Sequence, residues 1–132
     1  EISEEQLEKE KEKLSEIKFQ SISAKLVQIG DFSYHGMPRI IWIKVGGEGI
    51  FNLQKSIDEI LKESFKPEER FMSHLTIARI KYLKDVENFL QHLNNLHVEK
   101  IKFKVNSFKL MSSELKHMGP VYKAIEEFTL AG

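Results

Sequence analysis

The 132-residue chain is long enough for one domain with a hydrophobic core, because 41% of its residues are hydrophobic and 30% are charged. Its 20 basic and 20 acidic residues cancel, which argues against a protein that holds nucleic acid by bulk electrostatic attraction. It contains no cysteine, which excludes disulfides, thiolate nucleophiles and cysteine-based metal sites and favours a reducing compartment, the cytoplasm. From the length we expect a single domain over residues 1–132. No apolar run approaches the roughly 20 residues of a membrane span, so we expect no membrane contact.

The first part of the chain is predicted to form a helix and then two strands. Ser3 has capping-box spacing to a glutamine three residues later, and alternating Glu and Lys residues predict a surface helix from about Glu4 to Glu16. Alternating apolar residues predict a strand over Phe19–Ile29, and a nearly continuous apolar run predicts a strand over Arg39–Val45. Glycine and proline predict a loop over Asp31–Pro38, and this short separation favours antiparallel pairing.

The rest of the chain alternates between helical and strand patterns. The expected elements are a helix over Glu48–Ser64, a charged loop over Lys66–Arg70, a strand over His74–Ile80, a helix from near Asp85, a strand from Ile101 with a bulge near Asn106 and Ser107, a turn at Gly119–Pro120, and a last strand over Val121–Leu130. This order predicts an α+β domain with a largely antiparallel sheet and helices on one face. A helix followed by two strands occurs at each end, which hints at an internal repeat.

His74 and Thr76 form the most informative polar pair. Alternate side chains of a strand share a face, so these two are expected to point the same way while Leu75 and Ile77 point into a core. An imidazole can give or take a proton near neutral pH, and a hydroxyl can hydrogen-bond a phosphoryl oxygen. The pair therefore suits phosphodiester chemistry, although a lone histidine on a strand is often only structural.

Arg79 is the third candidate, and its position raises a question of strand geometry. In a regular strand it shares a face with Leu75 and Ile77, and it joins His74 only if the strand bends or ends before it. Two roles stay open, which are a phosphate contact from the strand end and a structural ion pair with Glu68 or Glu69 in the preceding loop.

Three segments together resemble a known family. His74-Leu75-Thr76-Ile77-Ala78-Arg79 is similar to the second His-x-Thr motif of the two-histidine phosphoesterase superfamily, in particular the RNA 2',3'-cyclic phosphodiesterases, also called 2'-5' RNA ligases. Pro38-Arg39-Ile40-Ile41-Trp42 resembles the family's Pro-Arg-Val-Leu-Trp strand, and Gly119-Pro120-Val121-Tyr122 resembles its closing strand. The order of the three segments along the chain also matches.

The resemblance implies a two-lobed, pseudo-symmetric α+β phosphoesterase fold with antiparallel sheets and outer helices. Each lobe of the family supplies one His-x-Thr strand to a central cleft. One histidine acts as base on water, the other acts as acid on the leaving ribose oxygen, and the threonines hold the phosphate. The implied reaction opens a 2',3'-cyclic phosphate to a 2'-phosphomonoester without metal or cofactor, and its reverse-type counterpart joins RNA ends through a 2'-5' bond. The implied substrates are RNA ends or cyclic nucleotides.

This chain contains one His-x-Thr sequence where the family has two. His35, His92, His97 and His117 are not followed by threonine at the required spacing and are interpreted as surface residues. We expect the first motif to lie upstream of Glu1, so that part of one lobe is missing here. The chain alone is then expected to be weak or inactive. It is also expected to expose a sheet edge that invites self-association, whereas the complete protein is a monomer.

Further substrate-binding candidates lie outside the His-x-Thr sequence. Arg39 is a candidate RNA contact at the cleft rim, and a surface ion pair is an equal alternative. Tyr122 is a candidate ligand contact or a cap on the sheet. Trp42, within an apolar run, is interpreted as core rather than as a base-stacking residue. The segment 32–36 is a candidate nucleotide-facing loop, and Phe71 and Met72 are candidates for the cleft mouth.

The leading function is thus an RNA-end phosphodiesterase with His74 and Thr76 as catalytic residues. The alternative is a non-catalytic module that binds RNA ends or nucleotides, which the single His-x-Thr favours and the unbroken His-x-Thr-x-x-Arg pattern disfavours. A related phosphodiesterase for 2'-5' oligoadenylate or a small cyclic nucleotide has the same site and is not separable by sequence.

Overall fold

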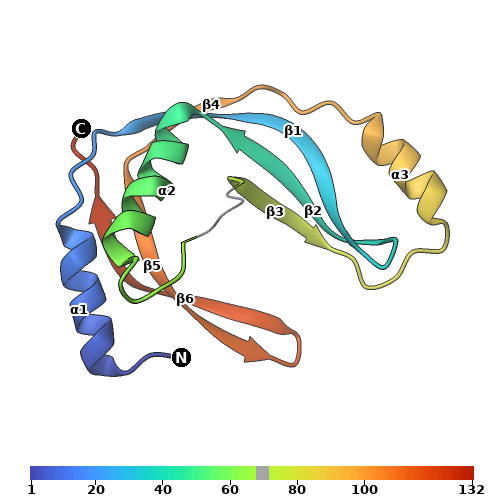
Figure 1. Ribbon diagram of the computed structural model, residues 1–132. Helices are drawn as coiled ribbons and strands as arrows, with labels where there is room; N and C mark the ends of the chain where they lie inside the picture. The colour runs from blue at the N-terminus through green and yellow to red at the C-terminus, as the bar shows by residue number, and fades with distance from the viewer. Residues whose placement is uncertain (68–71) are drawn as a thin grey trace. The chain divides into compact units, whose positions relative to one another are not determined.

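The computed structural model describes residues 1–67 and 72–132, and these residues form an α+β arrangement (Figure 1). The elements are α1 (Glu4–Ser15), β1 (Ile22–Tyr34), β2 (Met37–Gly46), α2 (Glu48–Leu61), β3 (His74–Arg79), α3 (Val86–Asn94), β4 (Lys102–Val105), β5 (Ser107–Lys116) and β6 (Gly119–Thr129). Their contacts divide the described chain into two compact units, one of residues 1–22, 52–67 and 104–132 and one of residues 23–51 and 72–103. The predicted α+β class is confirmed, and the single domain predicted over residues 1–132 stays a prediction.

A four-stranded sheet, most of which belongs to the second unit, has the order β3-β2-β1-β4, with β1–β2 and β2–β3 antiparallel. The loop predicted between its first two strands is wrong, because β1 continues to Tyr34 and β2 begins at Met37. The residues between them, His35 and Gly36, have φ values of 51° and 74°. Left-handed φ at both central residues is the type I′ turn, whose twist matches that of the strands it joins. A two-residue hairpin turn therefore replaces the loop.

Strand β3 lies at the end of this sheet, beside β2 alone among the described strands (Figure 1). The prediction that Leu75 and Ile77 point into a core is wrong, since 53% and 49% of their surfaces are exposed. An end strand has neighbours on one side only, so its apolar side chains lose part of the cover that a central strand has. By contrast, Ile41 and Trp42 on the central strand β2 are buried.

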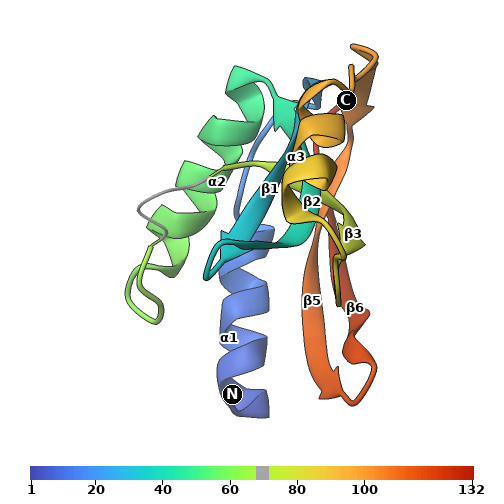
Figure 2. The same ribbon diagram turned by 90° about the vertical axis from the view of Figure 1, so that its right-hand side faces the viewer.

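The first unit contains the antiparallel pair β5–β6, whose strands run side by side in both views (Figures 1 and 2). The bulge predicted near Asn106 and Ser107 is instead a junction, where β4 of the four-stranded sheet ends and β5 of the other sheet begins. The irregularity in β5–β6 falls between Leu110 and Met111. The turn predicted at Gly119–Pro120 is also displaced, because both residues pair within the hairpin and residues 117–118 make the turn.

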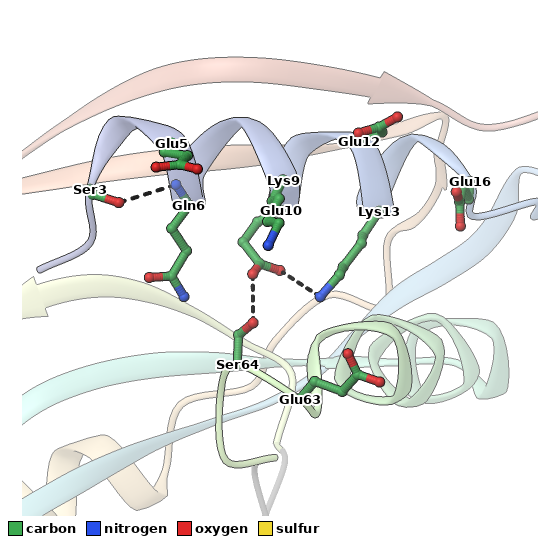
Figure 3. Close-up of a pocket in the computed structure, with 10 residues that line it drawn as sticks. All are labelled: Ser3, Glu5, Gln6, Lys9, Glu10, Glu12, Lys13, Glu16, Glu63 and Ser64. Atoms are coloured by element: carbon green, nitrogen blue, oxygen red, sulfur yellow. Dashed lines mark hydrogen bonds and ion pairs between the residues drawn. The ribbon is translucent and has the colours of Figure 1, made fainter.

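The first unit also shows how α1 is fixed. Ser3 caps the helix as predicted, because its hydroxyl oxygen accepts a hydrogen bond from the backbone N–H of Gln6 at 3.2 Å. Helix α2 ends at Leu61, three residues before the predicted end, and Ser64 in the following turn donates its hydroxyl to Glu10 Oε1 at 2.7 Å (Figure 3). Glu10 is buried, whereas the other charged residues of α1 are exposed or half-buried. This carboxylate ties α1 to the chain after α2.

A cavity of about 600 Å³ opens beside that contact and is lined by α1, by its cap residues Ser3 and Glu16, and by Glu63 and Ser64 (Figure 3). Glu10 Oε2 lies 3.9 Å from Lys13 Nζ and accepts no hydrogen bond within the described residues.

Among the described residues, no helix combines the length and the apolar character needed to cross a membrane.

Candidate functional site

The strand pairing of β3 decides which candidate residues share a face. Lys44 pairs with His74, Trp42 with Thr76, and Ile40 with Arg79. Directly paired residues project to the same face of a sheet, and alternate residues along β2 do so too. His74, Thr76 and Arg79 therefore lie on one face with Trp42, which we call the site face.

Arg79 reaches the site face because of an irregularity in β3. The register shifts between Ile41 and Trp42, whose partners are Ala78 and Thr76, so Ile77 is an extra residue on β3. A bulge of this kind re-aims the side chains that follow it. Regular alternation places Arg79 on the opposite face from His74, and the bulge reverses that. The first of the two geometries considered for Arg79, a bent strand, is the one found.

An aromatic cluster flanks His74 on the site face. The centroid of the Phe32 ring lies 5.3 Å from that of the His74 imidazole, with an angle of 84° between the ring planes. It lies 5.4 Å from the centroid of the Trp42 indole, with an angle of 46°. Trp42 lies over Gly30, since a Cβ atom at Gly30 would fall 2.4 Å from Trp42 Cη2. Trp42 is 8% exposed, which confirms its interpretation as core. The absence of a side chain at Gly30 thus permits the packing that places Phe32 against the imidazole.

The imidazole of His74 is also held by the backbone. Its Nδ1 lies 3.0 Å from the carbonyl oxygen of Met72. A carbonyl oxygen only accepts, so Nδ1 carries the proton of this hydrogen bond, and in the neutral ring Nε2 keeps its lone pair. His74 is exposed, which leaves Nε2 available to a ligand. The arrangement can take a proton at Nε2 and return it without losing the Nδ1 hydrogen bond.

The two candidate arginines, Arg39 and Arg79, have different surroundings. Arg39 Nη1 donates to the carbonyl oxygen of Lys81 at 3.1 Å, and the Ile80 amide donates to the Arg39 carbonyl at 2.8 Å. Arg39 is therefore attached to the chain just after β3, and it forms no ion pair with the described residues. Arg79 is exposed and likewise has no ion-pair partner within residues 1–67 and 72–132. Its suggested partners, Glu68 and Glu69, lie outside the described residues.

The remaining candidates are placed as follows. Tyr122 pairs with Ser113 in β5–β6, is 57% exposed, and belongs to the other compact unit. The segment 32–36 is the end of β1 and the turn, with the Tyr34 ring 4.2 Å from that of His35. Met72 contributes its carbonyl oxygen to His74, and Phe71 lies outside the described residues.

Sequence reasoning missed the positions of two lysines. Lys44 lies directly across from His74, and Lys25 pairs with Gly46 two residues further along β2. The alternation of Ile40, Trp42 and Lys44 was visible in the sequence, but the pairing with β3 was needed to relate it to His74. Within the described residues, no group of three or more potential metal-binding side chains is gathered.

Comparisons with known proteins identify the family of the chain. Residues 44–122 match the family model described as LigT like phosphoesterase. The chain is 33% identical over 131 residues to an RNA 2',3'-cyclic phosphodiesterase of Archaeoglobus fulgidus, covering 97% of this chain and 73% of that protein. It is also 33% identical over 128 residues to the protein of the same name from Methanocaldococcus jannaschii, covering 92% and 74%.

Solved structures show a similar fold. A Thermus thermophilus protein, 28% identical, superposes with a TM-score of 0.73 and covers 100% of this chain and 74% of that one. E. coli LigT complexed with 3'-AMP, at 15% identity and a TM-score of 0.62, covers 100% and 71% and shows the fold alone.

The fold and these relatives define the class of the protein, which is a phosphoesterase of the two-histidine superfamily. The chain belongs to the LigT-like phosphoesterase family, and its relatives named as RNA 2',3'-cyclic phosphodiesterases support an enzyme of this kind.

Proposed function

We propose that the protein opens RNA 2',3'-cyclic phosphates to 2'-phosphomonoesters, with His74 as a proton-transfer residue. The observation that carries the proposal is the hydrogen bond from His74 Nδ1 to the Met72 carbonyl, which leaves Nε2 for the substrate. The names of the relatives support this reaction over other phosphodiester chemistry.

The chemistry requires two proton movements. A water oxygen attacks the cyclic phosphorus, the bond from phosphorus to O3' breaks, water loses a proton, and O3' gains one. His74 Nε2 carries out one of these transfers. The Thr76 hydroxyl and the Arg79 guanidinium, on the same face, stabilise the negative charge on the phosphoryl oxygens. Arg39 and Tyr122 are proposed substrate contacts. Replacing water by a ribose 5'-hydroxyl in the same scheme produces a 2'-5' linkage, and no step needs a metal ion.

The test is hydrolysis of a nucleoside 2',3'-cyclic phosphate by the full product of the gene, with and without His74→Ala. General acid–base catalysis contributes roughly 10²- to 10⁴-fold, so we expect a loss of kcat of that order. His92→Ala is the matched control, because His92 bonds the Asn88 carbonyl through Nδ1 at 2.9 Å within α3. Unchanged turnover in His74→Ala contradicts the assignment.

One observation favours a second function, the non-catalytic binding of RNA ends. Residues 1–132 contain one His-x-Thr sequence, whereas the proposed reaction needs two proton-transfer groups. For the same reason we propose that residues 1–132 by themselves turn over substrate weakly or not at all. Binding of cyclic-phosphate RNA by the full gene product without any product formation decides for the binding module.

A further inference from the structure

Three basic side chains lie on the site face, and two of them have no part in the chemistry described above. Lys44 is paired with His74, and Lys25 is paired with Gly46. A Cβ atom at Gly46 would lie 3.8 Å from both Cγ and Cε of Lys25, so the stem of Lys25 crosses over this glycine. Because Lys44 and Gly46 alternate on β2, Lys25 belongs to the same face as His74. Arg79 is the third cation.

The charge on this face is one-sided. Among the residues of β1, β2 and β3 that the pairing assigns to the site face, three are cationic and none is a carboxylate. Asp31 pairs with Ile41 and so projects to the opposite face. Neither Lys25 nor Lys44 forms an ion pair within the described part of the chain, and both are exposed. In a chain of zero net charge, this local excess attracts anions to one surface.

The two lysines, Lys44 and Lys25, form a line that starts at His74, whereas Arg79 lies toward the other end of β3. Neighbouring strands lie about 4.8 Å apart and residues rise about 3.4 Å along a strand, so Lys44 is one strand away from His74. Lys25 lies one strand further and about 7 Å further along, by the same spacings. A mononucleotide whose cyclic phosphate sits at His74 has no second phosphate to offer to Lys25. A polynucleotide has one for each further residue.

We propose that Lys44 and Lys25 bind backbone phosphates of an RNA strand on the 5' side of its cyclic end. The protein then acts on the ends of RNA strands in preference to free cyclic mononucleotides. This inference rests on the proposed function, because it assumes that the cyclic phosphate is held at His74.

The first test measures strand binding separately from chemistry. The probe is a fluorescent single-stranded RNA octamer with hydroxyl ends, titrated with the full gene product at several salt concentrations. Each phosphate contact on a single strand contributes about 0.7 to the slope of log affinity against log salt, so the Lys25→Gln/Lys44→Gln double variant should lose about 1.4 from that slope. Between 50 and 200 mM salt, wild type should then lose about sevenfold more affinity than the variant.

The control is the Lys9→Gln/Lys84→Gln double variant, which changes net charge equally at exposed lysines away from the paired positions of the site face. It should keep the wild-type slope. An equal loss of slope in both double variants, or none in either, overturns the inference.

The second test compares kcat/KM for an octamer with a 2',3'-cyclic end and for a cyclic mononucleotide. The ratio of the two should fall in Lys25→Gln/Lys44→Gln, mainly through KM for the octamer, and should hold in the control. A ratio that does not change refutes the strand-binding role. If His74→Ala keeps full activity while the salt slope still depends on Lys25 and Lys44, the catalytic role proposed for His74 fails. The role of Lys25 and Lys44 in binding RNA then still holds.

Discussion

Replacing Gly30 by alanine tests whether close packing positions the reacting imidazole. The new methyl carbon would lie 2.4, 2.6 and 2.8 Å from Trp42 Cη2, Cζ2 and Cζ3. Real Cβ contacts are not this short, and a rigid ring has no flexible end that can yield, so Trp42 must move as a body. Phe32 lies between Trp42 and His74, with ring centroids 5.4 and 5.3 Å from theirs. Displacement of the indole is therefore transmitted to the imidazole.

Inserting one carbon into a packed core costs about 1–3 kcal/mol. For a chain of this size, we expect the melting temperature of Gly30→Ala to fall by roughly 4–12 °C. Since Trp42 is the single tryptophan, its fluorescence reports the change directly, and emission should shift to the red as the ring gains solvent. Misplacement of a catalytic group by 1 Å lowers turnover by up to about 100-fold, so we expect kcat for cyclic-phosphate hydrolysis to drop while the substrate still binds.

Gly36→Ala is the matched control, because Gly36 has φ of 74° but no atom within 4 Å of an added Cβ. Its expected cost is backbone strain of about 1–2 kcal/mol, with unchanged tryptophan fluorescence and unchanged kcat. If Gly30→Ala shows wild-type fluorescence and kcat, the idea that Trp42 and Phe32 hold His74 is refuted. A loss of stability equal to that of Gly36→Ala with no change in kcat would reduce Gly30 to a structural role.

Three further predictions concern single contacts. Glu10→Ala should lower the free energy of unfolding by about 1–3 kcal/mol, measured by urea denaturation, because it removes the acceptor of the Ser64 hydroxyl, and Glu10→Gln should lose less. His35→Asn should raise the free energy of unfolding by about 0.5 kcal/mol in the same assay, since asparagine tolerates left-handed φ better; a loss of stability would show that the ring contact with Tyr34 outweighs the strain. Phe32→Leu should lower kcat and move the ring-proton resonances of His74 in NMR spectra, whereas Phe32→Tyr should restore both; unmoved His74 resonances would contradict the contact.

Local patterns predicted the element types well because they depend on neighbouring residues. The Ser3 cap, the strand beginning at His74 and the helix beginning after Asp85 all follow from capping and periodicity, and the structure has each of them. The failures occur where the pairing of one strand with another decides. The segment 31–38 looks like a loop from its glycine and proline, but pairing with β1 and a turn of two residues extend both strands through it.

The same division holds for the candidate site. His74 and Thr76 share a face as strand periodicity predicted. The burial of Leu75 and Ile77 was predicted wrongly, because the sequence does not reveal that β3 is an end strand of its sheet. Nor does it reveal the backbone carbonyl of Met72 or the position of Lys44, since both depend on the path of the chain rather than on residue type.

The spacing of His-x-Thr-x-x-Arg explains why the bulge matters. The histidine and threonine are two residues apart, which suits a strand, but the arginine is three residues beyond the threonine and so falls on the opposite face of a regular strand. Ile77 is an extra residue on β3, so the three-residue step from Thr76 to Arg79 spans only two residues on β2, from Trp42 to Ile40. Arg79 therefore lies on the face that holds Thr76. In this chain, the histidine, threonine and arginine of the motif therefore share one face only because the strand is bulged at Ile77. Where that bulge is absent, the same six residues lose the arginine from the site while keeping the other two.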